Sequence, residues 1–298
     1  MMPHDDMMPL IESLMEVATK VSRGDYDDAA KLFEFAKQGK YPPTICQLAE
    51  AFGMMMVQVE AREFRLEHII EELETALARV RLLESIKEQL GKFVPSAVKT
   101  LIEVNPENPD LSKRDEDVTV VFLDIAGYTK MSEQVDAEKL NYLIQKYFSL
   151  FLDIILENKG DINETAGDGL MIIFQDADPV QHALNGVKAA VAIRHKTAIT
   201  NESLKGTYSP VIVNIGVNSG TASVGSTRFE GIAGTRWTFT ASGPVTNEAA
   251  RICTLASNGA IIIGHETYRR VMKHFKIKPA GEQKLKNVRK PVEVFEIM

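Results

Sequence analysis

The sequence predicts an α+β protein: a ferredoxin-like domain with an antiparallel-rich sheet, preceded by helices. Three observations predict it. Strand and helix patterns alternate after residue 115, a two-strand hairpin signal surrounds Gly167-Asp168-Gly169, and a long charged helix precedes both. The 298 residues are 45% hydrophobic and 25% charged, which is ordinary globular composition.

Residues 1–56 are expected to form helices broken by turns. A first apolar pattern starts at Leu10 and ends near Gly24, and a second one covers residues 29–36. Pro42-Pro43 then prevents the second helix from continuing. Nothing in this segment indicates chemistry, so we expect a regulatory or packing role.

Residues 57–95 carry the pattern of a coiled-coil stalk. Its apolar seam advances in alternating steps of four and three through Leu66, Ile70, Leu73, Leu77 and Val80. Leu83 arrives one position early, and the seam then continues in a shifted phase, which changes the supercoil locally. The pattern predicts a dimerisation stalk that ends at Pro95, followed by a proline-containing linker at 96–114.

Residues 115–298 alternate between strands and helices, as a ferredoxin-like domain requires. The expected strands are 118–122, 162–174 as a hairpin, 211–218, 236–241, 260–263 and 292–297. The expected helices are 140–156, 178–199, 244–256 and 265–274.

Composition excludes several classes of function. The net charge of −7 argues against a nucleic-acid binder, which normally shows a basic patch. Cys46 and Cys253 lie far apart, so neither a disulfide framework nor a zinc site is expected. The N-terminus lacks the features of a secretory signal, and no apolar run is long enough for a membrane span. We therefore expect a cytoplasmic protein.

Two carboxylates end neighbouring strands of the predicted sheet. Asp124 closes the first strand, and Asp168 lies at the tip of the hairpin that packs beside it. With a backbone carbonyl, for which that of Ile125 is the candidate, they would form an oxygen site suited to two Mg²⁺ or Mn²⁺ ions. The alternative is that each aspartate is an ordinary cap or turn residue, as Asp-Gly pairs often are.

Asn247 and Arg251 stand four residues apart, on one face of the helix expected at 244–256. Arginine can stabilise charge on a transferring phosphate, and an amide can orient a sugar oxygen. Taken alone, they also fit an ordinary surface pair. Together with the two acids and a late lysine in LKNV, they indicate phosphoryl chemistry.

These residues lie in five ordered motifs that resemble class III adenylate/guanylate cyclase catalytic domains. The motifs are FLDIAGYT, ETAGDGLMIIF, VNIGVNSGTASVGS, TASGPVTNEAARI and LKNVRKPVEVFEI. The stalk, which ends in LGKFVPSAV, resembles the signalling helices that enter such domains. Residues 1–56 bear a weak resemblance to HAMP-type linker modules.

The resemblance implies a mechanism and a dimer. Two metal ions held by Asp124, Asp168 and the Ile125 carbonyl would bind the triphosphate of ATP or GTP. The ribose 3′-hydroxyl would attack the α-phosphorus, with Asn247 placing the ribose and Arg251 stabilising the transition state. The acids and the Asn-Arg pair of one site would come from different subunits of a homodimer.

Two departures from the family pattern lie close to these motifs. Lys286 falls near the family's triphosphate-contacting lysine, but Asn287 replaces the glycine that usually follows it. Pro244 replaces an aspartate before the Asn247 helix, which removes a carboxylate and a backbone donor.

Two further positions of the family pattern select the purine. Glu164 occupies the place of a lysine in adenylate cyclases and a glutamate in guanylate cyclases. Thr240 is permissive, because its hydroxyl can donate to guanine O6 or accept from adenine N6. These two signals conflict, and since Glu164 should discriminate more strongly, the sequence slightly favours GTP over ATP. The alternative is that Glu164 is rotated into solvent and contacts no base.

Two other classes of function compete with this interpretation. One is a catalytically silent nucleotide-binding or dimerisation module that regulates a partner, and the retained acid and Asn-Arg pairs count against it. The other is a diguanylate cyclase, whose hairpin motif is absent from ETAGDGLM.

Overall fold

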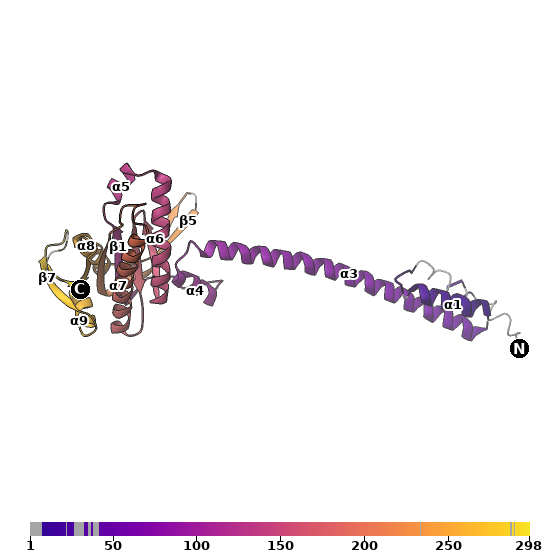
Figure 1. Ribbon diagram of the computed structural model, residues 1–298. Coiled ribbons are helices and arrows are strands. Elements are labelled where there is room, and N and C mark those ends of the chain that lie inside the picture. The colour runs from indigo at the N-terminus through magenta and orange to yellow at the C-terminus, as the bar shows by residue number, and fades with distance from the viewer. Residues whose placement is uncertain are drawn as a thin grey trace. The chain divides into compact units, whose positions relative to one another are not determined.

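The computed structural model describes residues 8–21, 23–26, 33–34, 37, 42–232, 234–286, 288 and 290–298. The chain divides into two compact units, Met1–Gln89 and Leu90–Met298 (Figure 1). Most of the helical pattern at 29–36, and Asn287, lie outside the described residues.

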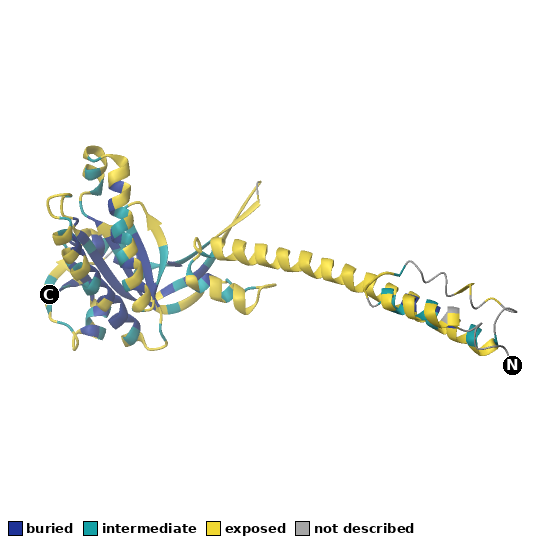
Figure 2. Cartoon of the chain, turned by 45° about the vertical axis from the view of Figure 1, so that its right-hand side comes forward, coloured by how far each residue is buried: buried dark blue, intermediate teal, exposed yellow. Residues whose placement is uncertain are grey.

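The N-terminal unit is helical, with α1 at Met8–Val21 and α3 beginning at Pro43. Val17 of α1 packs against Met56 of α3, and both side chains are buried. The helix of the stalk, which was expected at 57–95, both starts and ends earlier and runs from Pro43 to Gly91. Proline is tolerated in the first helical turn, so α3 can begin at Pro43. The seam residues Leu73 and Leu77 are exposed in the single chain (Figure 2).

The C-terminal unit contains an eight-stranded sheet with helices on its faces. Its strands are β1 (Arg114–Ile125), β2 (Gly160–Ala166), β3 (Gly169–Phe174), β4 (Val213–Gly231), β5 (Gly234–Ser242), β6 (Ile261–Gly264), β7 (Ile277–Gln283) and β8 (Val292–Ile297). Its helices are α4 (Ser96–Val104), α5 (Tyr128–Gln134), α6 (Ala137–Glu157), α7 (Pro179–Ser203), α8 (Pro244–Leu255) and α9 (His265–Val271).

The strand order confirms the predicted α+β fold. The sheet runs β2-β3-β1-β4-β6-β8-β7, and β5 pairs with β4 outside this path. Only β4 and β6 pair in parallel; the other pairs formed by the described strands are antiparallel. The part β2-β3-β1-β4, with α6 after β1 and α7 after β3, is the ferredoxin-like arrangement.

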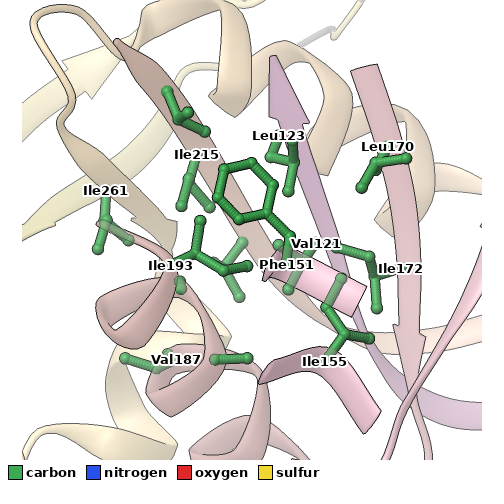
Figure 3. Close-up of a cluster of buried hydrophobic side chains, with 14 of the residues drawn as sticks. Val121, Leu123, Phe151, Ile155, Leu170, Ile172, Val187, Ile193, Ile215 and Ile261 are labelled. Atoms are coloured by element: carbon green, nitrogen blue, oxygen red, sulfur yellow. The ribbon is translucent and has the colours of Figure 1, made fainter. Parts of the chain in front are cut away.

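The two faces of the sheet bury different cores, because side chains alternate along each strand. Val121 and Leu123 of β1 pack with Phe151 of α6 and Ile193 of α7 (Figure 3). The intervening residues of β1 point the other way, where Val120 packs with Ala249 of α8. Asp124 continues this second series, so it lies on the same face of the sheet as α8.

Gly216 of β4 allows α8 to approach the sheet closely. A Cβ at this position would lie 2.2 Å from the backbone nitrogen of Cys253, where no atom fits. We expect Gly216→Ala to lower the free energy of unfolding by about 3 kcal/mol or more, since the backbone of α8 must move. Urea unfolding tests this against Gly91→Ala, because an added Cβ at Gly91 would meet nothing within 4 Å. Equal stability of the two variants would contradict the expectation.

Candidate active site

The fold brings the two predicted metal-binding aspartates together. Asp124 of β1 pairs with Gly169 of β3, and Asp168 lies in the turn between β2 and β3. The amide of Ile125 donates a hydrogen bond of 3.2 Å to the Asp168 carbonyl oxygen, which fixes the turn beside the end of β1. Gly167 takes a φ of 59°, a left-handed conformation that glycine adopts without strain.

The two carboxyl groups are close enough to influence each other's ionisation. The pKa of Asp124 is raised to about 6, first by partial burial, then by the charge of Asp168 and a hydrogen bond with it. Two adjacent carboxylates repel each other, so a bound cation would relieve an unfavourable charge. Among the described residues no group of three or more His, Cys, Asp or Glu could hold a metal ion. The predicted metal site has only two such side chains, Asp124 and Asp168. Its third ligand is a backbone carbonyl, which is not a His, Cys, Asp or Glu side chain.

A cavity of about 300 Å³ lies next to this pair. Asp124 and Glu164 supply charged groups to its wall, and Met171 supplies an apolar surface. The α8 part of the wall consists of Ala250, Cys253 and Thr254. Asp124, a predicted metal ligand, and Glu164, a predicted base-selecting residue, therefore line the same cavity.

The two base-selecting residues lie side by side. Glu164 of β2 and Thr240 of β5 are joined by a hydrogen bond of 3.3 Å, which the threonine hydroxyl donates to the carboxylate. The shared proton leaves both side chains able to accept further hydrogen bonds. This pair thus presents mainly acceptors to a bound base.

Three predicted site residues do not line this cavity in the described part of the chain: Asn247, Arg251 and Lys286. Asn247 and Arg251 lie on the same face of α8 as Ala250 and Thr254, but only Ala250 and Thr254 of these four line the cavity. Asn247 is exposed and Arg251 is partly exposed. Lys286 is exposed in the turn after β7. Among the predicted site residues, Asp124 and Glu164 thus line this cavity, and Asn247, Arg251 and Lys286 do not.

Several contacts at the site were not predicted from the sequence. Cys253 lines the cavity, and burial together with the Asp124 charge raises the pKa of its thiol to about 12. Asn163 donates a hydrogen bond to the carbonyl of Phe239, next to Thr240. The sequence offers no signal for either contact, because both depend on the packing of distant segments.

Asp124→Asn is expected to stabilise the folded protein in the absence of metal. The folded-state pKa of Asp124 lies above its ordinary value of 3.8, so its contribution to stability is lost as pH rises through about 6. Removing this charge should raise the free energy of unfolding at about pH 7.5 by on the order of 1 kcal/mol, since water screens the exposed carboxylate. The gain should shrink toward about pH 4.5.

Urea unfolding in the presence of a chelator measures this effect. Asp153→Asn, on the exposed surface of α6, is the control. An Asp124→Asn variant less stable than the wild type at neutral pH would show that the carboxylate has a structural role.

Comparison with known proteins identifies the family of the C-terminal unit. The family model "Adenylate and Guanylate cyclase catalytic domain" matches residues 111–298. The terminal-differentiation specific adenylate cyclase of Dictyostelium discoideum is 33% identical over 181 residues, which cover 59% of this chain and 8% of that protein. Adenylate cyclase 1 of Rhizobium meliloti (strain 1021) is 24% identical over 193 residues, 61% of this chain and 28% of that protein. The chain thus spans less than a third of the length of these relatives.

Solved structures share the fold of the C-terminal unit. The adenylyl cyclase CyaB from P. aeruginosa is 26% identical with a TM-score of 0.58, over 63% of this chain and 96% of that chain. The guanylyl cyclase Cya2 is 24% identical with a TM-score of 0.57, over 62% of this chain and 93% of that chain. None of the helices in the described residues is both long and apolar enough to cross a membrane. Because the family model matches more than half of its length, the chain belongs to the adenylate and guanylate cyclase catalytic domain family.

Proposed function

We propose that the protein is a nucleotidyl cyclase of signal transduction. It would convert a purine nucleoside triphosphate to the 3′,5′-cyclic monophosphate and pyrophosphate. The observation that carries the proposal is the pairing of Asp124 with Asp168 beside a cavity that also contains Glu164, in a chain of this family.

The residues at the carboxylate pair fit a divalent metal site. The carboxylate oxygens of Asp124 and Asp168 and the carbonyl oxygen of Ile125 are hard ligands of the kind that Mg²⁺ and Mn²⁺ prefer. Burial first, and then the charge of Asp168, raise the pKa of Asp124 to about 6, and a bound cation would offset both effects. Two bound ions would neutralise the triphosphate and favour ionisation of the ribose 3′-hydroxyl.

The remaining groups would orient and stabilise the reacting nucleotide. Asn247 would hold the ribose so that its 3′-oxygen stands in line with the α-phosphorus. Arg251 would stabilise the charge that builds up on the α-phosphate as the bond to the leaving pyrophosphate lengthens. Lys286 would contact the triphosphate.

We propose that the complete site forms only in a homodimer. Asn247 and Arg251 do not line the cavity that holds Asp124, and the family resemblance implies that a second copy supplies them. The exposed seam of the stalk at 57–95 offers one dimer contact, with Leu73 and Leu77 among its apolar residues. The β4–β5 hairpin offers another exposed apolar surface, with Phe229 and Trp237 near its end (Figure 2).

We further propose that the segments before residue 115 regulate this dimer. Residues 1–56 would form a HAMP-like module, 57–95 the coiled-coil stalk and 96–114 the linker to the catalytic domain at 115–298. The continuous helix α3 supports a mechanical connection through the stalk, since it extends from Pro43 to Gly91.

GTP is the favoured substrate in this proposal, ahead of ATP. The Glu164 carboxylate can accept from guanine N1–H and N2–H₂, which are adjacent donors. Adenine would place its N1 acceptor opposite a carboxylate, which leaves both groups unsatisfied. The names of the relatives do not decide between the bases, because both adenylyl and guanylyl cyclases are among the solved structures.

Product analysis tests the proposal directly. The purified protein is incubated with Mn²⁺ and equal concentrations of GTP and ATP, and cyclic nucleotides and pyrophosphate are quantified. We expect cyclic GMP in excess over cyclic AMP, with one pyrophosphate for each cyclic product. If neither nucleotide yields pyrophosphate, the protein is a silent nucleotide-binding or dimerisation module instead.

A further inference from the structure

Strand β2 contains a β-bulge directly before the base-selecting Glu164. Ile162 pairs with Ile172 of β3, whereas Glu164 pairs with the adjacent Met171. Asn163 is therefore an extra residue that has no partner in this strand pair. Bulges of this kind change the direction of the side chains that follow them.

The bulge determines which face of the sheet Glu164 occupies. Ile162 and Ile172 belong to the core beneath α6 and α7, where Figure 3 shows Ile172 near Ile155. Met171 belongs to the other core, on the α8 side, and lines the active-site cavity together with Glu164. In a regular strand, residues two apart point to the same face, so Glu164 would follow Ile162 toward α6 and α7. The extra residue turns it toward Asp124.

The Asn163 side chain connects the bulge to β5. Its Nδ2 donates a hydrogen bond of 2.9 Å to the carbonyl oxygen of Phe239, the residue before Thr240. Strand β5 pairs with β4 in the sheet, and β2 pairs with β3. Asn163 therefore links two strands that the sheet itself does not join, beside the Glu164–Thr240 hydrogen bond.

The other side of the bulge is anchored to α4. The two carboxylate oxygens of Asp161 accept hydrogen bonds from the amides of Ser96 and Ala97, at 3.0 and 2.9 Å. Pro95 at the N-cap of α4 supplies no side-chain cap, so Asp161 satisfies these amides from a distant part of the chain. Asp161 thus fixes the start of β2 just before the bulge.

We propose that Asn163 is a specificity-determining positioning residue. It holds the bulge against β5, so that Glu164 and Thr240 present their acceptors to the purine in one fixed geometry. Asp161 supports this geometry from α4. The inference rests on the proposed cyclase function, and Asn163 itself does not touch the nucleotide in it.

The test compares purine selectivity in Asn163→Ala and Asn163→Leu proteins. Leucine keeps the branched side-chain shape of asparagine, although it is larger, and cannot donate to Phe239. In both variants the ratio of kcat/KM for GTP to that for ATP should fall by about tenfold, because small misplacements of a binding group have effects of this size. The change should appear in KM for GTP more than in kcat, since Asp124 and Asp168 keep their positions. Competition binding with a fluorescent GTP analogue provides a second readout.

Asn158→Ala is the matched control. The Asn158 amide also donates to a backbone carbonyl, that of Ile154, but at the end of α6. Its GTP/ATP ratio should equal that of the wild type. If Asn163→Ala and Asn163→Leu fold, turn over nucleotide and keep the wild-type ratio within about twofold, the inference is wrong. A wild-type protein inactive with both nucleotides would instead refute the proposed function, so the two failures are distinguishable.

Discussion

Asp168→Ala is expected to abolish cyclase turnover, with a loss of at least about a thousandfold, while the protein stays folded. Removing one of two carboxylate ligands should cost several kcal/mol of transition-state stabilisation, and about 4 kcal/mol corresponds to a thousandfold. The fold should survive because Ile125 donates to the backbone carbonyl of residue 168, which alanine retains. Pyrophosphate release and circular dichroism measure the two parts of this expectation.

Asp153→Ala provides the control for Asp168→Ala. It also removes an aspartate carboxylate, but from the exposed face of α6, outside the segments that contain Asp124 and Asp168. Its turnover should match the wild type. If Asp168→Ala also remains active, Asp168 is a turn residue and the metal assignment fails.

Mixing inactive Asp124→Ala chains with inactive Arg251→Ala chains should restore activity. In a mixed dimer, one site combines the acids of the Arg251→Ala chain with the Arg251 of the other chain, and is therefore intact. The second site carries both lesions. With random exchange, half of the dimers are mixed and each has one of two sites, so about a quarter of the wild-type activity should return.

The control for this experiment mixes Asn247→Ala with Arg251→Ala. Both substitutions lie on α8, so every site in the mixed dimer lacks one of the two groups. No recovery is expected there. If the first pair also shows no recovery, although subunit exchange is demonstrated by labelled chains, the shared site is wrong.

The sequence predicted the parts of the fold that depend on local patterns. The apolar run at 118–122 identified β1, and the Gly167-Asp168-Gly169 turn identified the β2–β3 hairpin. Because these strands are neighbours in a ferredoxin-like sheet, the proximity of Asp124 and Asp168 also followed from the sequence.

Features that depend on distant contacts were not predictable. Ile162 and Glu164 are two residues apart, so their spacing alone places them on one face, and only the pairing with β3 reveals the bulge. The hydrogen bond that the Ser96 amide donates to the Asp161 carboxylate joins two segments that no shared sequence pattern connects. The start of α3 at Pro43 was missed because the same proline can end one helix or begin the next. The HAMP-like module and the coiled-coil dimer stay predictions.

Calorimetric titration of Mn²⁺ into the nucleotide-free protein tests the metal site at Asp124 and Asp168 most directly. Wild type and Asp153→Ala should bind the ion equally. Asp168→Ala should bind it at least about tenfold more weakly, because removing a direct ligand should lower metal affinity at least as much as removing a group that only orients a ligand. Wild-type Mn²⁺ affinity in Asp168→Ala would contradict the assignment of this carboxylate pair as the metal centre.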